Sequence, residues 1–195
     1  MSRTVLKIIL IITITIGIII MFAKKDFTSL EVVNLKINYE TFWKEASEKD
    51  FDEQLKLWNK HIEGAQPKFY AQVVHSTEDS SDWKERKEKS ARNLFKVLPK
   101  LNKKIMNEYS SFDKTIDQQI KIFKATFKDA NFRDLKIFAA PVLLRFNGQG
   151  SFIDEKPILA FGMDMISYLK DDPKVISGIN YAHNAGVFYS HELFH

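Results

Sequence analysis

Cysteine is absent from the 195 residues of this chain. The absence excludes disulfide bonds, thiol catalysis and zinc sites built from cysteine within this stretch. It also excludes attachment to a lipid through the cysteine of a lipoprotein signal. It does not indicate the compartment, because many bacterial proteins outside the cytoplasm lack cysteine.

Internal repeats and long polar low-complexity runs are absent as well, and glycine and proline are scarce, with 7 and 5 residues. Hydrophobic residues make up 45% of the chain, and 16 Phe, 6 Tyr and 3 Trp supply large apolar faces. This composition is typical of a folded protein, and the length suits one domain with a core plus a short appendage.

Acidic residues are absent from residues 1–25, although the chain as a whole has 25 of them. The basic residues of this segment are Arg3, Lys7, Lys24 and Lys25. They account for the whole formal net charge of +4, so residues 26–195 are neutral. A neutral folded part lacks the positive field that nucleic-acid binding requires, and we predict no nucleic-acid partner.

Residues 8–23 form an apolar run of 16 residues without a charged side chain, which residues 5–6 extend if Lys7 reaches the membrane surface. A signal peptide has an apolar part of about 7–15 residues, whereas a signal anchor needs roughly 17–25. We favour an uncleaved anchor, with a cleaved signal peptide as the alternative. Either interpretation makes residues 1–25 a targeting segment and predicts that residues 26–195 are extracytoplasmic, membrane-anchored or secreted.

Helical periodicity dominates residues 38–131. A break is expected near Lys49–Phe51, and Pro67 is expected to open a helical stretch over residues 67–75. Ser80-Ser81 and Glu85 have the spacing of a capping box for a further helix. Within that helix we expect a kink or division at Pro99 and a break near Ser110-Ser111.

Aromatic and histidine side chains in the helical region are interpreted as structural. Trp43, Trp58 and Trp83 recur at helical spacing, which favours a core position over ligand stacking. His61 and His75 are isolated in the sequence, which favours surface or hydrogen-bonded positions over metal ligation.

Extended patterns replace the helical pattern after residue 133. Residues 135–146 predict a strand, in which Pro141 indicates an edge position or a bulge. Residues 147–150 predict a turn and residues 157–166 a second strand, so we expect an antiparallel pair. The predicted fold class is α+β, with a membrane segment, a mostly helical region, a short strand pair and a final helix.

The chain ends with His191-Glu192-Leu193-Phe194-His195, the pattern H-E-x-x-H. On a helix, residues four apart share one face, so both imidazoles can reach one Zn²⁺ at about 2.0–2.1 Å. Glu192 lies about 100° around the axis from His191, where it can accept the proton of a zinc-activated water. We therefore predict His191 and His195 as metal ligands and Glu192 as the catalytic base. A surface histidine pair on an ordinary helix is the alternative, and the pattern arises by chance in roughly one of 100 such chains.

Other polar residues are assigned no direct role in the predicted zinc site. His183 is expected at a helix start or on the surface. Asp164 is interpreted as a structural carboxylate at a strand end rather than a group that orients a zinc ligand. The pairs Asp154-Glu155 and Asp171-Asp172 are interpreted as solvated loop charges.

A family resemblance rests on these motifs. H-E-L-F-H preceded by a short strand, residues 158–166, resembles the zincin metallopeptidases. The segment Leu159–Met165 with its Gly-x-Asp, some 30 residues before the motif, is similar to the predicted zinc-protease families related to gliding-motility lipoproteins. In zincins an edge strand binds extended substrate antiparallel to itself, and the third zinc ligand lies downstream of the motif. The resemblance implies a zincin-like domain over residues 26–195, with a peptide or protein as substrate.

We therefore expect a membrane-anchored or exported zinc metallopeptidase. Because the sequence stops at the second predicted ligand, we expect a domain truncated at its C-terminus that binds zinc weakly and is inactive. One alternative is a non-catalytic cell-envelope assembly or interaction protein with a zincin-like domain. Another is an anchored helical interaction module whose terminal motif is accidental. The intact Glu192 favours catalysis, since a purely structural helix has no need of a glutamate there.

Overall fold

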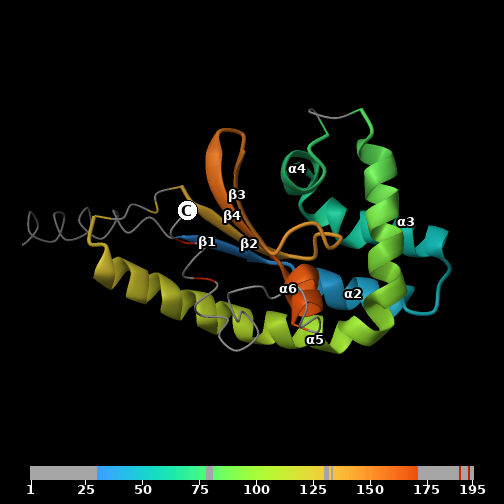
Figure 1. Ribbon diagram of the computed structural model, residues 1–195, viewed down its shortest axis with the longest axis horizontal. Coiled ribbons are helices and arrows are strands. Elements are labelled where there is room, and N and C mark those ends of the chain that lie inside the picture. Colours follow the sequence, from blue (N-terminus) through green and yellow to red (C-terminus); the bar gives the residue numbers. More distant parts are fainter. Residues whose placement is uncertain are drawn as a thin grey trace, which may run out of the picture.

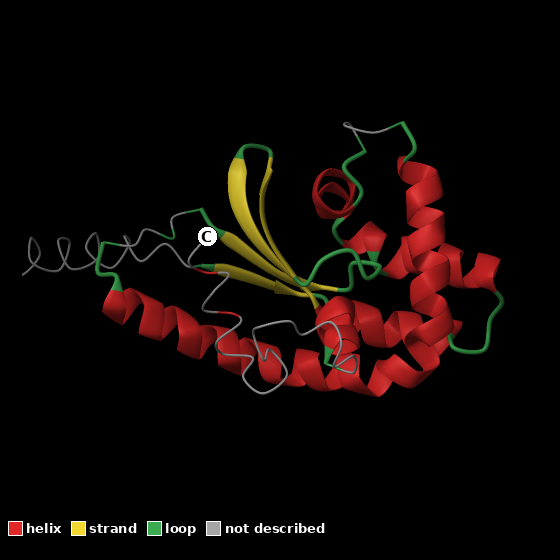
Figure 2. Ribbon diagram, in the orientation of Figure 1, coloured by secondary structure: helices red, strands yellow, loops and turns green. Residues whose placement is uncertain are grey.

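The computed structural model describes residues 30–77, 81–129, 132, 134–170, 189 and 193, and within these residues the fold is α+β (Figures 1 and 2). The strands are β1 (Glu31–Asn34), β2 (Lys136–Ala140), β3 (Gly148–Ile153) and β4 (Lys156–Gly162). The helices are α2 (Lys36–Ala46), α3 (Phe51–His61), α4 (Pro67–Phe69), α5 (Trp83–Thr126) and α6 (Met163–Leu169). A 3-10 turn covers Glu63–Ala65, and a π-helical turn covers Tyr70–Val74.

The strands form one mixed sheet in the order β1-β2-β4-β3. β1 and β2 are parallel, as are β2 and β4, and β3 lies antiparallel to β4 at the edge. The predicted antiparallel pairing of residues 135–146 with 157–166 is therefore wrong, because these segments supply the parallel neighbours β2 and β4. The predicted turn at residues 147–150 instead contains the start of β3.

A two-residue turn joins β3 to β4 and accounts for the missed hairpin. Asp154 and Glu155 have φ values of 49° and 64°, and Ile153 pairs with Lys156 across them. Two successive positive φ values are the geometry that matches the twist of a hairpin, and they normally favour Asn-Gly or Asp-Gly. Asp-Glu is a weak signal for such a turn, and the sequence therefore indicates only loop charges at these positions.

Both predicted strands are also shorter than expected. β2 ends at Ala140, and Pro141 follows it without an N–H group to continue the ladder. Because β2 lies between β1 and β4, the predicted edge position is wrong. β4 ends at Gly162, and Met163–Leu169 is helix α6, so the predicted strand over residues 157–166 is too long.

The helix boundaries agree with several sequence predictions. The break before Phe51 is confirmed, and Asp50 caps α3 by accepting a 3.0 Å hydrogen bond from the Glu53 amide. Pro67 begins α4, as predicted, and the π-helical turn carries the chain on to Val74. The predicted Ser81 cap is wrong, because α5 follows Asp82 without a side-chain cap. Ser80 lies outside the described residues.

Helix α5 runs for 44 residues and includes Pro99. Figure 1 shows it as two limbs that meet at a bend, which confirms the predicted kink, since proline removes a helical hydrogen bond. The predicted break at Ser110-Ser111 is wrong. The Ser110 and Ser111 hydroxyls donate to main-chain carbonyls of the preceding turn, Ser110 to Met106 at 2.8 Å, so the helix accommodates both.

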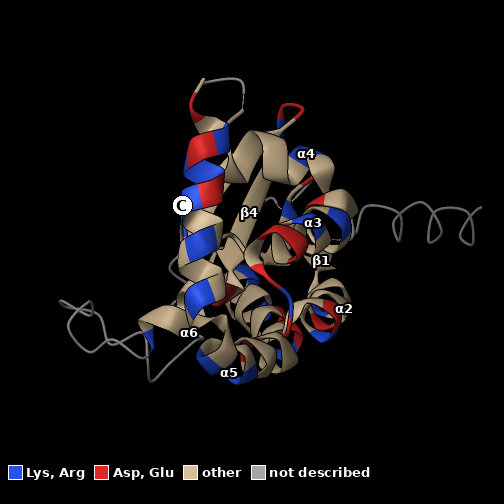
Figure 3. Ribbon diagram, turned by 90° about the vertical axis from the view of Figure 1, so that its right-hand side faces the viewer, with Lys and Arg blue, Asp and Glu red and all other residues tan. Residues whose placement is uncertain are grey.

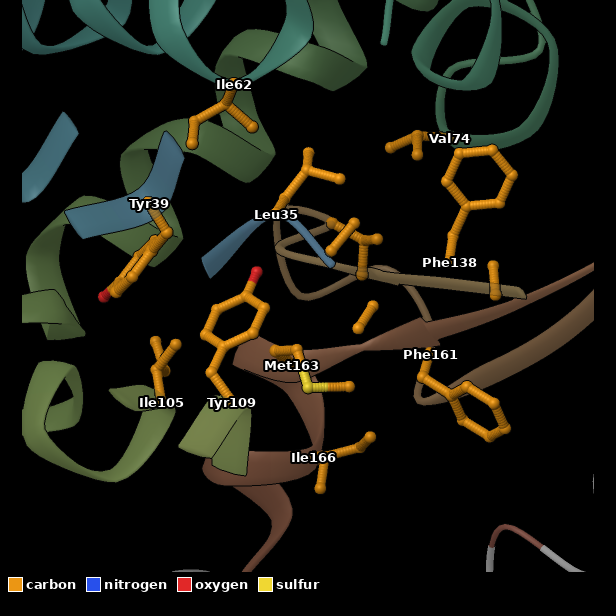
Figure 4. Close-up of a cluster of buried hydrophobic side chains, with 14 of the residues drawn as sticks. Leu35, Tyr39, Ile62, Val74, Ile105, Tyr109, Phe138, Phe161, Met163 and Ile166 are labelled. Carbon is orange, nitrogen blue, oxygen red and sulfur yellow. The ribbon is translucent and has the colours of Figure 1, made fainter. Parts of the chain in front are cut away.

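Helices cover both faces of the sheet and form one core with it. On one face, Phe69 of α4 stacks on Phe138 of β2 with ring centroids 4.4 Å apart. On the other face, Phe112 of α5 contacts Phe161 of β4 at 5.5 Å. Figure 4 shows the apolar side chains that meet between these layers. Trp58 is fully buried, as predicted, while Trp43 and Trp83 are partly buried.

Charged side chains lie mainly on the helices, and Figure 3 shows both signs alternating along them while β4 is largely uncharged. No helix among the described residues is both long enough and apolar enough to cross a bilayer. The predicted membrane segment falls in residues 1–29, which are outside the described residues.

Candidate functional site

The predicted zinc ligands His191 and His195 and the predicted base Glu192 lie outside the described residues. His183 and the pair Asp171-Asp172 lie outside them as well. Two residues of the same segment are described, Tyr189 and Leu193, and both are helical. They are buried, with exposed fractions of 1% and 9%.

Tyr189 packs between the sheet and α5. Its ring lies 4.8 Å from Phe161 of β4 and 5.2 Å from Phe112 of α5, with near-perpendicular planes in both contacts. Edge-to-face aromatic contacts of this kind stabilise packing beyond the area they bury. Burial raises the pKa of Tyr189, and the Glu108 carboxylate raises it further, so the hydroxyl stays protonated at neutral pH.

Leu193 lines a cleft of about 430 Å³ beside the β3–β4 hairpin. The strand residues of this cleft are Gly150, Ser151, Phe152, Pro157, Ile158 and Leu159. Tyr189, two residues before the motif, is thus packed on the face of the sheet that α5 covers. Leu193, within the motif, lies next to the β3–β4 hairpin at the sheet edge.

Asp164 is fully buried, with an exposed fraction of 0%, whereas the other buried carboxylate among the described residues, Glu108, is 8% exposed. The two oxygens of Asp164 accept 2.8 Å hydrogen bonds from the main-chain amides of Val142 and Leu144. Burial raises the pKa of Asp164 to about 6, although these and neighbouring backbone hydrogen bonds lower it. These bonds agree with the predicted structural role, because Asp164 holds the turn that follows β2, but Asp164 lies in the first turn of α6 rather than in a strand.

Three buried tyrosines, Tyr39, Tyr70 and Tyr109, lie within electrostatic range of Asp164, and Figure 4 shows Tyr39 and Tyr109. Burial raises the pKa of each tyrosine far above its ordinary value, and the negative charge of Asp164 adds to this. The Tyr70 hydroxyl donates to the Pro141 carbonyl at 2.7 Å, and that of Tyr39 donates to Asn102 at 3.0 Å. The Tyr39 and Tyr70 hydroxyls are thus protonated donors that stabilise the core, whereas the buried Tyr109 hydroxyl has no hydrogen-bond partner among the described residues.

The two histidines of the helical region form hydrogen-bonded pairs with carboxylates, as predicted. His61 Nε2 lies 2.9 Å from Glu45 Oε2, and His75 Nε2 lies 2.9 Å from Glu63 Oε1. Within the described part of the chain, no three His, Asp or Glu side chains come together as a group that could hold a metal ion.

Glu63 is the centre of a buried polar cluster that the sequence did not indicate. Besides His75, its carboxylate accepts hydrogen bonds from Trp58 Nε1 at 3.0 Å and Lys87 Nζ at 2.6 Å. Burial raises the pKa of Glu63, but the hydrogen bonds from His75 and Lys87 outweigh it, so the pKa lies below its usual range. Trp58, His75 and Lys87 are 5, 12 and 24 positions from Glu63 in the sequence, so no short sequence pattern predicts that they meet.

The geometry of this cluster identifies it as structural. His75 Nδ1 is buried without a hydrogen-bond partner among the described residues, and the imidazole stacks on Trp83. A carboxylate-oriented imidazole can serve as a metal ligand when its second nitrogen is accessible, but this nitrogen is sealed from solvent.

Comparison of the whole chain with protein-family models, curated proteins and solved structures gives no match.

Proposed function

We propose that this chain is part of a zinc-dependent peptidase, exported or held at a membrane by its N-terminal segment. His191 and His195 are the zinc ligands, and Glu192 is the base that accepts a proton from the attacking water. A zinc ion held by these two imidazoles would supply Lewis-acid chemistry, lowering the pKa of a water molecule and polarising the peptide carbonyl. Two imidazoles fit the donor preference of zinc, and a third protein ligand is required in addition.

The observation that carries this proposal is the burial of Tyr189 and Leu193, four residues apart and both helical. On an α-helix each residue turns by about 100°, so positions 191 and 195 lie about 200° from positions 189 and 193. A continuous helix would thus direct both imidazoles away from the face that packs on Phe161 and Phe112. The histidine pair would then be available to a metal rather than used in the core.

The sheet supplies a second argument. In zincins an edge strand binds the substrate as an additional antiparallel strand, and the edge strand of this sheet next to the predicted motif is β3, not residues 158–166. β3 and Leu193 line the same cleft, so one residue within the predicted motif lies next to a strand edge to which a peptide main chain could add. A peptide substrate fits this arrangement because its main chain can pair with β3.

Zinc titration of the 195-residue chain tests the ligand assignment. We expect weak zinc binding that is lost in His191→Ala and in His195→Ala and is retained in the control His183→Ala. Binding that persists in both ligand variants would contradict the assignment.

Catalysis is tested on a protein that also contains the third ligand. Glu192→Gln should abolish peptide hydrolysis while zinc content, measured by elemental analysis, stays unchanged. Unchanged turnover would refute the role of Glu192. A wild-type protein that binds zinc and cleaves no peptide would instead support a non-catalytic envelope protein.

A further inference from the structure

The last turns of α5 and the two residues after it carry an exposed surface that combines apolar and basic side chains, with the Phe127 ring also packed on Phe123 at 4.7 Å. Ile122 and Phe127 are 50% and 43% exposed. The lysines beside them, Lys121, Lys124 and Lys128, are exposed, and none has an ion-pair partner among the described residues. We call these five residues the α5 tip. Apolar side chains flanked by lysines are typical of helices that rest on a lipid surface.

Contacts place the start of β1 near the α5 tip. Glu31 of β1 pairs in register with Lys136 of β2, and the two side chains form an ion pair at 2.9 Å. Just before β2, the Phe132 ring contacts Phe123 of α5 at 5.6 Å, and the Leu135 amide donates to the Phe132 carbonyl. Figure 1 shows that the C-terminal limb of α5 runs toward the end of the long axis where β1 begins.

The sequence before β1 limits how far this end of the molecule can lie from a membrane. The apolar run ends at Ala23, and the described chain begins at Leu30. Seven residues span at most about 25 Å when fully extended. If residues 5–23 enter a bilayer, the β1 end of the domain is held within that distance of the headgroups, and the α5 tip is at the same end.

We infer that the α5 tip docks on the anionic lipid surface of the membrane that holds the N-terminal segment. Phe127 and Ile122 enter the interfacial region, and Lys121, Lys124 and Lys128 contact anionic headgroups. The inference goes beyond the peptidase proposal and rests only on the part of it that places residues 5–23 in a membrane. Docking would orient the domain, because one end of its long axis faces the bilayer.

Because the chain contains no cysteine, a single introduced cysteine can be labelled at a chosen position to test this docking. Single variants Ile122→Cys and Phe127→Cys of the full chain are labelled with a fluorophore in nanodiscs that contain phosphatidylglycerol and a doxyl-labelled lipid. The matched control is Ile37→Cys, whose side chain is 75% exposed and lies on α2, which follows the opposite end of β1. Ile16→Cys, in the apolar run, reports insertion of the N-terminal segment.

We expect lipid quenching at positions 16, 122 and 127 that exceeds quenching at position 37 at least twofold. Replacing Lys121 and Lys128 by Gln should lower the equilibrium constant for docking by about fivefold per lysine, and phosphatidylcholine alone should lower it as well. Quenching at 16 but not at 122 and 127 overturns the docking and leaves the anchor. No quenching at any position overturns both. Shielding of the label at 127 in detergent without lipid would show that a second copy of the chain covers the tip.

Discussion

At the scale of single residues, the buried Asp164 connects the junction of β4 and α6 to the turn that follows β2. It lies in the first turn of α6, directly after β4, and its carboxylate binds the turn that follows β2. In that turn Leu143 and Leu144 both have φ of 57°, a conformation that side chains with a Cβ adopt only at a cost. The two amide-to-carboxylate hydrogen bonds offset this strain and stabilise the turn.

The raised pKa of Asp164 predicts how stability varies with pH. Because burial raises the pKa of Asp164 to about 6, against about 4 in an unfolded chain, the folded state binds the proton more tightly. The free energy of unfolding should therefore fall as pH rises from about 4 to 6, by at most about 3 kcal/mol, and level off above that. Urea unfolding at stepped pH measures this slope.

Asp164→Asn is the control for this pH dependence because it cannot titrate; since its NH2 group cannot accept the second backbone hydrogen bond, only the pH slope is compared and not the absolute stability. It should flatten the slope between about pH 4.5 and 6. Glu63, whose pKa is lowered, contributes stability that is lost only below its ordinary range, so it acts at lower pH and with the opposite sign. An equal slope in wild type and Asp164→Asn would contradict the assignment to Asp164.

The Glu63 cluster predicts a second effect at the residue scale. Glu63→Ala would leave the buried amine of Lys87 and the donors of Trp58 and His75 without their acceptor. We expect a loss of about 3 kcal/mol in the free energy of unfolding, measured with urea. Glu45→Ala removes the carboxylate of the exposed His61 pair and should leave the urea midpoint nearly unchanged. Equal losses in the two variants would show that burial of Glu63 is unimportant.

At the scale of elements, Gly162 allows β4 to end against the loop that precedes β3. A Cβ at this position would lie 2.1 Å from the Phe146 carbonyl oxygen and 2.5 Å from a methyl of Val142. The Gly162 amide also donates to the Asn147 carbonyl at 2.9 Å, which holds the two segments together. The close approach requires the absence of a side chain.

Gly162→Ala should therefore destabilise the fold by roughly 2–3 kcal/mol, since the backbone atom it meets cannot move without breaking the junction. Gly150→Ala on β3 is the control, because a Cβ there meets no atom within 4 Å. Urea unfolding of the two variants compares them directly. If Gly162→Ala were as stable as Gly150→Ala, the close packing at the end of β4 would be disproved.

At the scale of the whole molecule, Tyr189 joins the C-terminal segment to the layers formed earlier in the chain. Its ring packs against both Phe161 and Phe112, which also contact each other. Tyr189→Ala should lower the free energy of unfolding by about 3–5 kcal/mol, as expected for loss of a large buried aromatic side chain. Tyr168→Ala serves as a control, because Tyr168 is 38% exposed. A Tyr189→Ala protein with wild-type stability would show that the C-terminal segment does not pack on the sheet.

The sequence alone was sufficient for features that depend on neighbours within one or two turns. The break before Phe51, the helix start at Pro67 and the kink at Pro99 follow from local backbone chemistry, and the buried position of Trp58 follows from helical periodicity. The His-Glu-x-x-His pattern is likewise local, so the candidate ligands His191 and His195 could be named from spacing alone.

Only the tertiary structure decided which strands pair and which distant polar groups meet. An apolar strand can pair in parallel or antiparallel with equal local preference, so the position of β4 between β2 and β3 depends on the layers of helix around the sheet. The contacts of Asp164 with residues 142 and 144, and of Glu63 with His75 and Lys87, arise for the same reason. Burial brings them together, and burial is a property of the folded chain rather than of any short segment.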